Sequence, residues 1–181
     1  MLREGKLDEG KAELESYLKR TPTGPGSDIV RQWLSHPTKV KFALAPEFEV
    51  KTISGEAITS KSLVGKVVVI DFWATWCPPC RASVPELKEL TVKYPKDKLT
   101  VISVSSDRDQ DKWRSFVAEK QMSWPQYLDT DEHMTKLFNI HEFPTYIIID
   151  GDGFLRERIT DFDPRASLAS RLKDPLKKLL E

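Results

Sequence analysis

The sequence predicts an α/β sandwich, and two observations carry that prediction. Residues 66–73 (Lys-Val-Val-Val-Ile-Asp-Phe-Trp) form a β-branched apolar run, which is typical of a strand buried on both faces. From residue 42 onward, strand patterns alternate with amphipathic helical patterns, and the last two strands flank a Gly-rich turn at 150–153. The chain has 181 residues, enough for one such domain and a smaller segment.

Each element of the sandwich follows from its own pattern. Alternating residues predict short strands at 48–53 and 57–59, joined by a turn, ahead of the buried strand. A helix then runs from Pro78 to about Tyr94, with its apolar residues on one side. The remaining expected elements are strands at 99–104, 126–128, 145–149 and 155–159, and helices at 110–120, 132–138 and from Pro164 onward.

The first 37 residues are expected to form a separate helical segment. Residues 6–20 predict an amphipathic helix, and residues 29–35 predict a second, shorter one after a turn. The spacing of small, large apolar and proline residues resembles the second helix of a tetratricopeptide repeat, although an ordinary helical hairpin fits equally well. We therefore expect two domains, 1–37 and 42–181, with 1–37 as the end of a repeat array in a longer protein. The residues that carry the spacing are Gly5, Gly10, Leu14, Tyr17 and Pro22.

Composition excludes several classes of function. The 28 basic and 28 acidic residues cancel, which argues against a general nucleic-acid binder or a protein held on anionic membranes. No apolar run approaches the roughly 20 residues that a membrane helix needs. Two cysteines form neither a disulfide-rich scaffold nor a complete four-thiolate zinc site. We expect no metal and no cofactor.

The two cysteines stand together, as Cys77-Pro78-Pro79-Cys80, where the buried strand gives way to a helix. The surrounding Trp-Ala-Thr-Trp-Cys-Pro-Pro-Cys segment resembles the thioredoxin-fold thiol–disulfide oxidoreductases, above all their TlpA/ResA-like branch, over roughly residues 42–181. Phe143-Pro144-Thr145 stands where that family has its cis-proline loop. The resemblance implies a thioredoxin-like three-layer sandwich with an N-terminal β-hairpin extension. It also implies a thiol–disulfide oxidoreductase that acts on protein disulfides.

The spacing of the cysteines suits two-step exchange through a redox-active Cys77–Cys80 disulfide. Cys77 is expected at the helix N-cap, where the helix dipole and free N–H groups favour a thiolate. Cys80, one turn later, is expected to face inward. An exposed sulfur then attacks the substrate disulfide, and a sheltered sulfur resolves the mixed disulfide. Pro78 and Pro79 lack N–H groups, so Cys77 relies mainly on the Cys80 amide. This moderate stabilisation of the thiolate predicts a reductant or an intermediate electron donor.

Asp71, six residues before Cys77, is the expected base. Burial at the end of the strand is expected to raise the pKa of its carboxyl. In thioredoxins the matching aspartate relays the proton of the second cysteine, and the resemblance carries that role to Asp71 for Cys80. The alternative is a strand-end carboxylate satisfied by local N–H groups. Ser83 departs from the TlpA/ResA-like pattern, which commonly has an acidic residue three positions after the second cysteine, so cytochrome-maturation specificity does not carry over.

Substrate binding is assigned to residues beside the cysteines. Trp76 is expected to shield the Cys77 sulfur, and Pro78 lies next to it in sequence. A cis bond before Pro144, implied by the resemblance, would let the Phe143 backbone pair with an extended substrate strand. The loop at 105–111 is expected to be a helix cap with solvated charges.

The expected partners are disulfide- or dithiol-containing proteins and an upstream reductant. We expect a monomer that binds no nucleic acid and that meets a membrane only through a region absent from this chain. The resemblance to TlpA/ResA-like proteins implies a location outside the bacterial cytoplasm. Residues 1–4 open without a secretory signal, however, which leaves either a cytoplasmic protein or a targeting segment that has been removed.

Two alternative functions stay open. One is a thiol peroxidase, for which Thr75 stands two residues before Cys77 instead of the three that peroxiredoxins need. The other is a non-catalytic interaction module.

Overall fold

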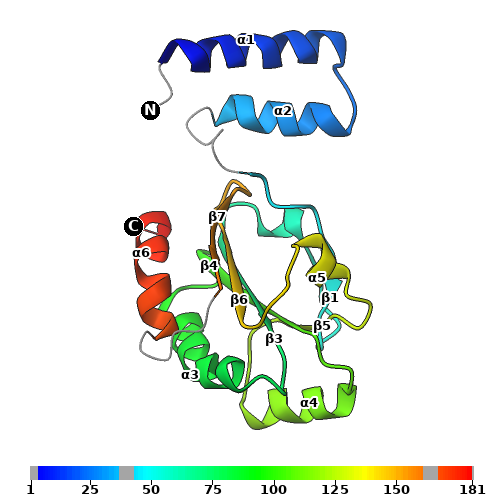
Figure 1. Cartoon of the computed structure of the whole chain (residues 1–181), viewed down its shortest axis with the longest axis vertical. Helices are drawn as coiled ribbons and strands as arrows, with labels where there is room; N and C mark the ends of the chain where they lie inside the picture. Colours follow the sequence, from blue (N-terminus) through cyan, green and yellow to red (C-terminus); the bar gives the residue numbers. More distant parts are fainter. Residues whose placement is uncertain (1–3, 37–42, 161–166, 181) are drawn as a thin grey trace. The chain divides into compact units, whose positions relative to one another are not determined.

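A computed structural model describes residues 4–36, 43–160 and 167–180 (Figure 1). The chain divides into two compact units, Met1–Leu44 and Ala45–Glu181. Pro37, residue 42 and Pro164, where the sequence predicts the ends of segments, lie outside the described residues.

The first unit is a helical hairpin of α1 (Glu4–Arg20) and α2 (Pro25–Ser35). Pro25 opens α2 four residues earlier than the pattern predicts, because proline suits the first position of a helix, where its missing N–H is not needed. The Ser27 hydroxyl is buried and donates to the Thr21 carbonyl (2.8 Å). A Cβ on Gly26 would meet the Tyr17 hydroxyl at 2.7 Å, so the two helices approach closely where α2 carries no side chain.

The second unit holds two sheets. A short antiparallel hairpin joins β1 (Glu49–Lys51) to β2 (Ala57–Thr59), followed by a 3-10 turn at Ser60–Leu63 that the sequence analysis did not predict. The first strand is shorter than expected because the chain leaves β2 after Lys51, and the Ile53 N–H bonds to the Gln126 carbonyl instead (2.8 Å).

The main sheet has five strands: β3 (Val67–Trp73), β4 (Leu99–Ser105), β5 (Gln126–Leu128), β6 (Thr145–Ile149) and β7 (Leu155–Ile159). Their order is β5-β4-β3-β6-β7. β3 lies at the centre, parallel to β4 and antiparallel to β6. β5 is parallel to β4, and β7 closes the other edge as a hairpin with β6. The helices of this unit are α3 (Pro78–Lys93), α4 (Gln110–Glu119), α5 (His133–Leu137) and α6 (Leu168–Leu180).

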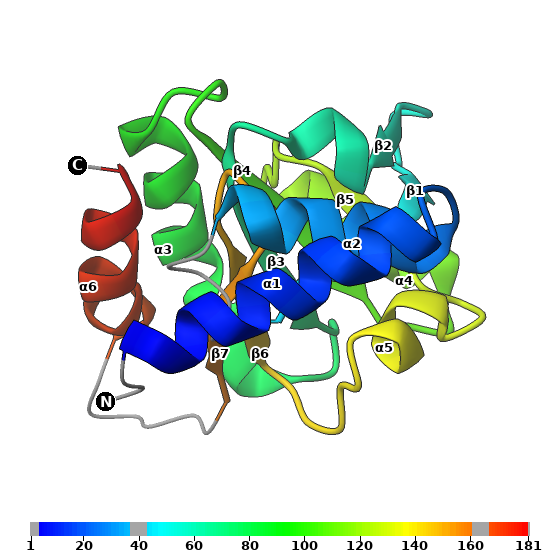
Figure 2. The same ribbon diagram turned by 90° about the horizontal axis from the view of Figure 1, so that it is seen from above.

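The two faces of β3 feed two separate apolar clusters. Val69 and Trp73 pack with α3, α4 and α6, whereas Ile70 and Phe72 pack on the opposite face with α5. Figures 1 and 2 both show α3 and α6 lying together on one side of the sheet. Because side chains alternate along a strand, Asp71 shares the face of Val69 and Trp73 and points toward the layer that α3 covers. The predicted α/β sandwich is confirmed.

Candidate active site

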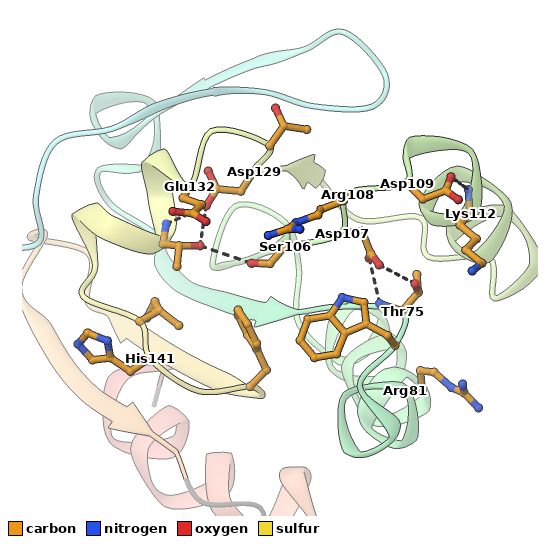
Figure 3. A pocket seen from close by; sticks show the side chains of 15 residues that line it. Thr75, Arg81, Ser106, Asp107, Arg108, Asp109, Lys112, Asp129, Glu132 and His141 are labelled. Atoms are coloured by element: carbon orange, nitrogen blue, oxygen red, sulfur yellow. Dashed lines mark hydrogen bonds between the residues drawn. The ribbon is translucent and has the colours of Figure 1, made fainter.

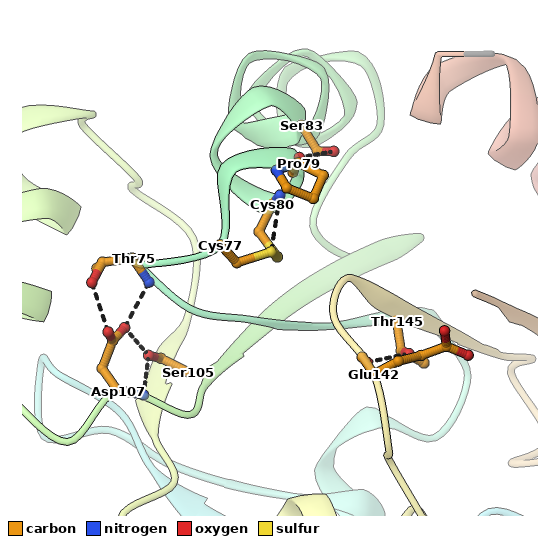
Figure 4. Close-up of a disulfide and its surroundings, with 9 residues drawn as sticks. All are labelled: Thr75, Cys77, Pro79, Cys80, Ser83, Ser105, Asp107, Glu142 and Thr145. Carbon is orange, nitrogen blue, oxygen red and sulfur yellow. Dashed lines mark hydrogen bonds between the residues drawn. A yellow bond between two sulfur atoms is a disulfide. The ribbon is translucent and has the colours of Figure 1, made fainter. Parts of the chain in front are cut away.

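The cysteine pair lies where β3 ends and α3 begins. Cys77 is the N-cap residue of α3 and is joined to Cys80 by a disulfide, with their Cα atoms 5.3 Å apart (Figure 4). The Cys80 amide donates to the Cys77 Sγ atom (3.3 Å). Pro78 and Pro79 occupy the two positions between them and have no N–H to offer. The sulfur at the N-cap therefore receives one amide of the first helical turn.

Both cysteines are buried in this oxidised form. The exposed fraction is 5% for Cys77 and 2% for Cys80, so the expected contrast between an exposed and a sheltered sulfur is small. The reason is that both belong to the apolar cluster beneath α3, together with Trp73 and Val84. In this form, neither sulfur is freely open to solvent.

Asp71 is buried on the same face of the sheet. Its Oδ2 atom accepts a hydrogen bond from the Ser103 hydroxyl on β4 (2.7 Å), and the Trp124 indole N–H donates to that same hydroxyl (2.8 Å). Burial raises the pKa of Asp71 to about 7, although the bond from Ser103 opposes the rise. A carboxyl with that pKa exchanges its proton near neutral pH, as a general base must.

Ser83 lies on the buried side of α3, one turn after Cys80. Its hydroxyl donates to the Pro79 carbonyl of the preceding turn (3.2 Å; Figure 4). A neutral hydroxyl therefore stands at the position where the TlpA/ResA-like pattern commonly has an acid.

An aromatic pair stands at the mouth of the site. The Trp76 side chain is 61% exposed, and its ring meets that of Phe143 edge-on, with centroids 5.8 Å apart. Pro78 is exposed beside Cys77, whereas Pro144 is buried. The Phe143–Pro144 peptide bond is cis. Phe143 thus lies just before β6, whose register with β3 begins at Thr145.

Asp107 is a site residue that the sequence analysis missed. The loop after β4 was expected to carry solvated charges, but Asp107 is 4% exposed. It accepts hydrogen bonds from the Thr75 amide (2.9 Å), the Thr75 hydroxyl (2.6 Å) and the Ser105 hydroxyl (2.6 Å; Figure 4). Because β3 and β4 are parallel neighbours, the loops that follow them meet at one edge of the sheet. Asp107 therefore holds the loop that precedes Cys77 in place through its hydrogen bonds to Thr75.

A cleft of about 780 Å³ opens beside the aromatic pair (Figure 3). Trp76, Phe143 and Ile140 supply apolar lining, while Arg81, Arg108 and Lys112 supply cationic side chains. His141 also lines the cleft, where its ring is hydrogen-bonded to Asn139. In the part of the chain that the structure describes, no three His, Cys, Asp or Glu side chains gather to hold a metal ion.

Comparison with known proteins places this site in a family. The model of the AhpC/TSA family matches residues 43–158, which include the cysteines, Asp71 and the cis-proline loop. The chain belongs to the AhpC/TSA family. Among relatives in this family, the thioredoxin-like protein YneN of Bacillus subtilis is 34% identical over 116 residues, covering 62% of this chain and 67% of YneN.

Two further similarities bear on fold and chemistry. The thiol-disulfide oxidoreductase ResA of Bacillus thuringiensis is 31% identical over 129 residues, which cover 71% of this chain and 75% of ResA. A crystal structure from Chlorobium tepidum, described as that of a thiol:disulfide interchange protein DsbE, superposes on this chain with a TM-score of 0.70 at 26% identity. The match covers 77% of this chain and 97% of that one. The predicted thioredoxin-like fold and the TlpA/ResA-like resemblance are confirmed. This AhpC/TSA family member is a thiol–disulfide oxidoreductase.

Within the described residues, no helix is both long and apolar enough to cross a membrane.

Proposed function

We propose that this protein reduces disulfides in protein substrates, outside the cytoplasm, by dithiol–disulfide exchange at Cys77 and Cys80. The observation that carries the proposal is the bridged pair at the N-terminus of α3, with a buried carboxyl of raised pKa on the sheet face beneath that helix. The attacking and resolving sulfurs and the base thus come from three consecutive pieces of chain: the end of β3, the N-cap and the first turn of α3.

The reaction proceeds in two exchanges. The Cys77 thiolate attacks one sulfur of the substrate disulfide, which gives a mixed disulfide and releases the other substrate sulfur as a thiolate. Asp71 then takes the proton of the Cys80 thiol, and the Cys80 thiolate attacks the Cys77 sulfur. The Cys77–Cys80 disulfide forms, and the second substrate sulfur leaves. The substrate gains two electrons, and an upstream dithiol reductant later returns them to the enzyme.

The substrate is held by the aromatic pair and the proline loop. Trp76 and Phe143 offer an apolar surface at the mouth of the site, with Pro78 exposed next to the attacking sulfur. The Phe143 backbone, ahead of the register of β6, pairs with an extended substrate segment, and Pro144 fixes the turn of that loop. This arrangement suits a polypeptide with an accessible disulfide more than a small disulfide, which would touch little of the surface.

The direction of electron flow follows from the two prolines. A thiolate at Cys77 is stabilised by the helix dipole and by the Cys80 amide, but not by N–H groups at positions 78 and 79. Less stabilisation of the reduced form makes a weaker oxidant. We therefore expect the reduction potential of the pair to be more negative than about −200 mV, the side of the scale on which reducing members of the fold lie.

The remaining parts of the proposal concern setting and organisation. The TlpA/ResA-like resemblance supports action on the outer side of a bacterial membrane, with recharging by a membrane reductant. The redox domain is proposed to span 42–181 and to act as a monomer, and residues 1–37 are proposed to close a repeat array. Expression of the natural full-length gene product, followed by fractionation, tests the location.

Insulin reduction with defined cysteine variants tests the proposed chemistry. Wild-type protein reduced by dithiothreitol is expected to precipitate insulin B chain, and Cys77→Ser is expected to abolish this activity. Cys80→Ser is expected to accumulate a mixed disulfide through Cys77, visible by mass spectrometry without reductant. Activity that survives Cys77→Ser, or a glutathione-equilibrated potential near −120 mV, would reject respectively the mechanism and the reducing direction.

The thiol peroxidase alternative is tested by peroxide consumption without added thioredoxin. The Thr75 hydroxyl donates to Asp107 at 2.6 Å, so it is engaged on the loop side and does not support peroxide binding at Cys77. We expect peroxide turnover no faster than that of free cysteine.

A further inference from the structure

Three polar side chains lie side by side across the centre of the main sheet. Asp71 on β3 pairs in register with Ser103 on β4 and with Tyr146 on β6. Residues directly opposite one another in neighbouring strands share a face, so all three belong to the side that α3 covers. Beyond Ser103, the buried Gln126 on β5 adds a fourth polar residue at the edge of the sheet. The row crosses a face whose other residues are mainly apolar, such as Val69.

Tyr146 is the polar residue directly beside Asp71 that the proposed mechanism leaves unused. Its side chain is 2% exposed, and its hydroxyl makes no hydrogen bond of ordinary geometry with any described residue. A buried polar group without a well-formed hydrogen bond is destabilising, and its presence here calls for an explanation. Phenylalanine would fill the same space without that hydroxyl.

The surroundings of the hydroxyl show where it acts. Ser83, the residue that replaces the usual acid, is near enough on α3 to lower the pKa of Tyr146. Burial is the larger effect and raises that pKa, and the Asp71 carboxylate raises it further. Two more charged groups influence the pKa of the phenol through space: Glu86 on α3, which accepts a bond from the Ala169 amide, raises it, and Arg171 on α6, which donates to the Thr160 carbonyl, lowers it. The phenol is thus a neutral donor at neutral pH.

We propose that Tyr146 is a positioning residue for the second exchange: its hydroxyl, enclosed with Ser83 between β6 and α3, stabilises the ionised Asp71 carboxylate that takes the Cys80 proton. This inference rests on the proposed role of Asp71 as the base. It also explains how the site works with a serine at position 83. In place of an acidic side chain on α3, the hydroxyl of Tyr146 on β6 supplies the polar group.

The proton balance of the step is simple. Before the second exchange, Asp71 is a carboxylate and Cys80 is a thiol, and afterwards Asp71 is a carboxylic acid and Cys80 is bonded to Cys77. Tyr146 neither gains nor loses a proton. It changes the pH at which the carboxylate is available, and Ser103 remains the donor on the opposite side of the row.

Tyr146→Phe tests the inference, and Tyr127→Phe is the matched control. Tyr127 lies on β5 in register with Val104, so its ring belongs to the opposite face of the same sheet. The direct readout is the titration of the Asp71 side-chain carboxyl carbon, followed by ¹³C NMR in the oxidised protein. We expect a midpoint near pH 7 in the wild type and in Tyr127→Phe, and near pH 8 in Tyr146→Phe, because the dipole of the phenol no longer stabilises the charged carboxylate.

The kinetic readout is resolution of a preformed mixed disulfide between pH 6 and pH 9. At pH 7 the ionised fraction of Asp71 falls from about one half to about one tenth, so Tyr146→Phe is expected to resolve about fivefold more slowly. At pH 9 the two rates converge, which a general packing defect would not produce. An Asp71 midpoint unchanged in Tyr146→Phe overturns the inference even if Asp71→Asn abolishes the pH dependence of resolution. If Asp71→Asn leaves that dependence intact, the relay itself is wrong, and the inference falls with it whatever the NMR midpoint.

Discussion

Replacing Asp71 with asparagine is expected to make the protein more stable at alkaline pH, relative to wild type, than at acidic pH. The carboxyl has a pKa of about 7 in the folded protein, against 3.8 for the unperturbed group. Folding therefore raises its affinity for a proton. Since the folded state binds the proton more tightly, the free energy of unfolding falls as pH rises from about 4 to about 7 and is level above that.

The size of the effect follows from the difference between the two pKa values. About three pKa units at roughly 1.4 kcal/mol each amount to about 4 kcal/mol, which is a large share of the stability of a typical domain. Asparagine has no such titration but buries two N–H groups, a cost that does not depend on pH. The diagnostic quantity is therefore the change in the stability difference between pH 4 and pH 8, and not its sign at one pH.

Urea unfolding of the oxidised protein measures this quantity. Tryptophan fluorescence is a suitable signal, because four of the five tryptophans lie in the second unit. We expect Asp71→Asn to gain about 4 kcal/mol on wild type between pH 4 and pH 8. Asp97→Asn, at an exposed loop position of the same unit, is expected to show no such trend. A stability difference for Asp71→Asn that stays within 1 kcal/mol across this range would refute the reasoning.

Two further predictions concern the loops around the cysteines. Asp107→Asn removes the charge that accepts both hydrogen bonds from Thr75. We therefore expect a loss of about 2 kcal/mol in the free energy of unfolding and a slower reduction of insulin. Asp109 is exposed on the same loop, and Asp109→Asn is expected to leave the rate of reduction unchanged. Trp76→Ala and Phe143→Ala are expected to raise KM for insulin severalfold with little change in the rate of reducing a small aromatic disulfide; equal losses with both substrates would show that the pair does not form a docking surface.

The sequence predicted those features that are encoded locally. The apolar run of β3 and the Cys-Pro-Pro-Cys segment after it determine a buried strand, an N-cap and a proline-opened helix within about fifteen residues. Burial of Asp71 followed from the same run, because a carboxyl between two β-branched or aromatic neighbours of a central strand has nowhere else to lie. These features depend on neighbours in the chain, so a single sequence is enough to find them.

Features that depend on strand pairing could not be predicted in this way. Asp107 looked like one of several charges in a solvated loop, and its burial follows from the parallel pairing of β3 with β4, which brings its loop against Thr75. The two cysteines have similar, small exposed fractions, and this too is a property of the assembled apolar cluster and not of the motif. A signal was present at Asp107, however, since it stands just past the carboxyl end of the strand expected at 99–104, and ligand-binding loops of parallel sheets collect at the carboxyl ends of strands.

The same distinction separates the chemistry of this site from its pH response. The cysteine motif is sufficient to specify disulfide exchange. In the proposed mechanism, however, removal of the proton from Cys80 also depends on the row made by Ser103, Asp71 and Tyr146 on three different strands. Because side chains alternate along a strand, a slip of one residue in either pairing would turn Ser103 or Tyr146 to the opposite face and leave Asp71 among apolar groups. Its carboxyl would then ionise at still higher pH, and the second exchange would slow at neutral pH although every residue of the motif was intact. If Asp71 is the base, as we propose, the register of the central sheet therefore helps to determine the rate at which the enzyme releases its product.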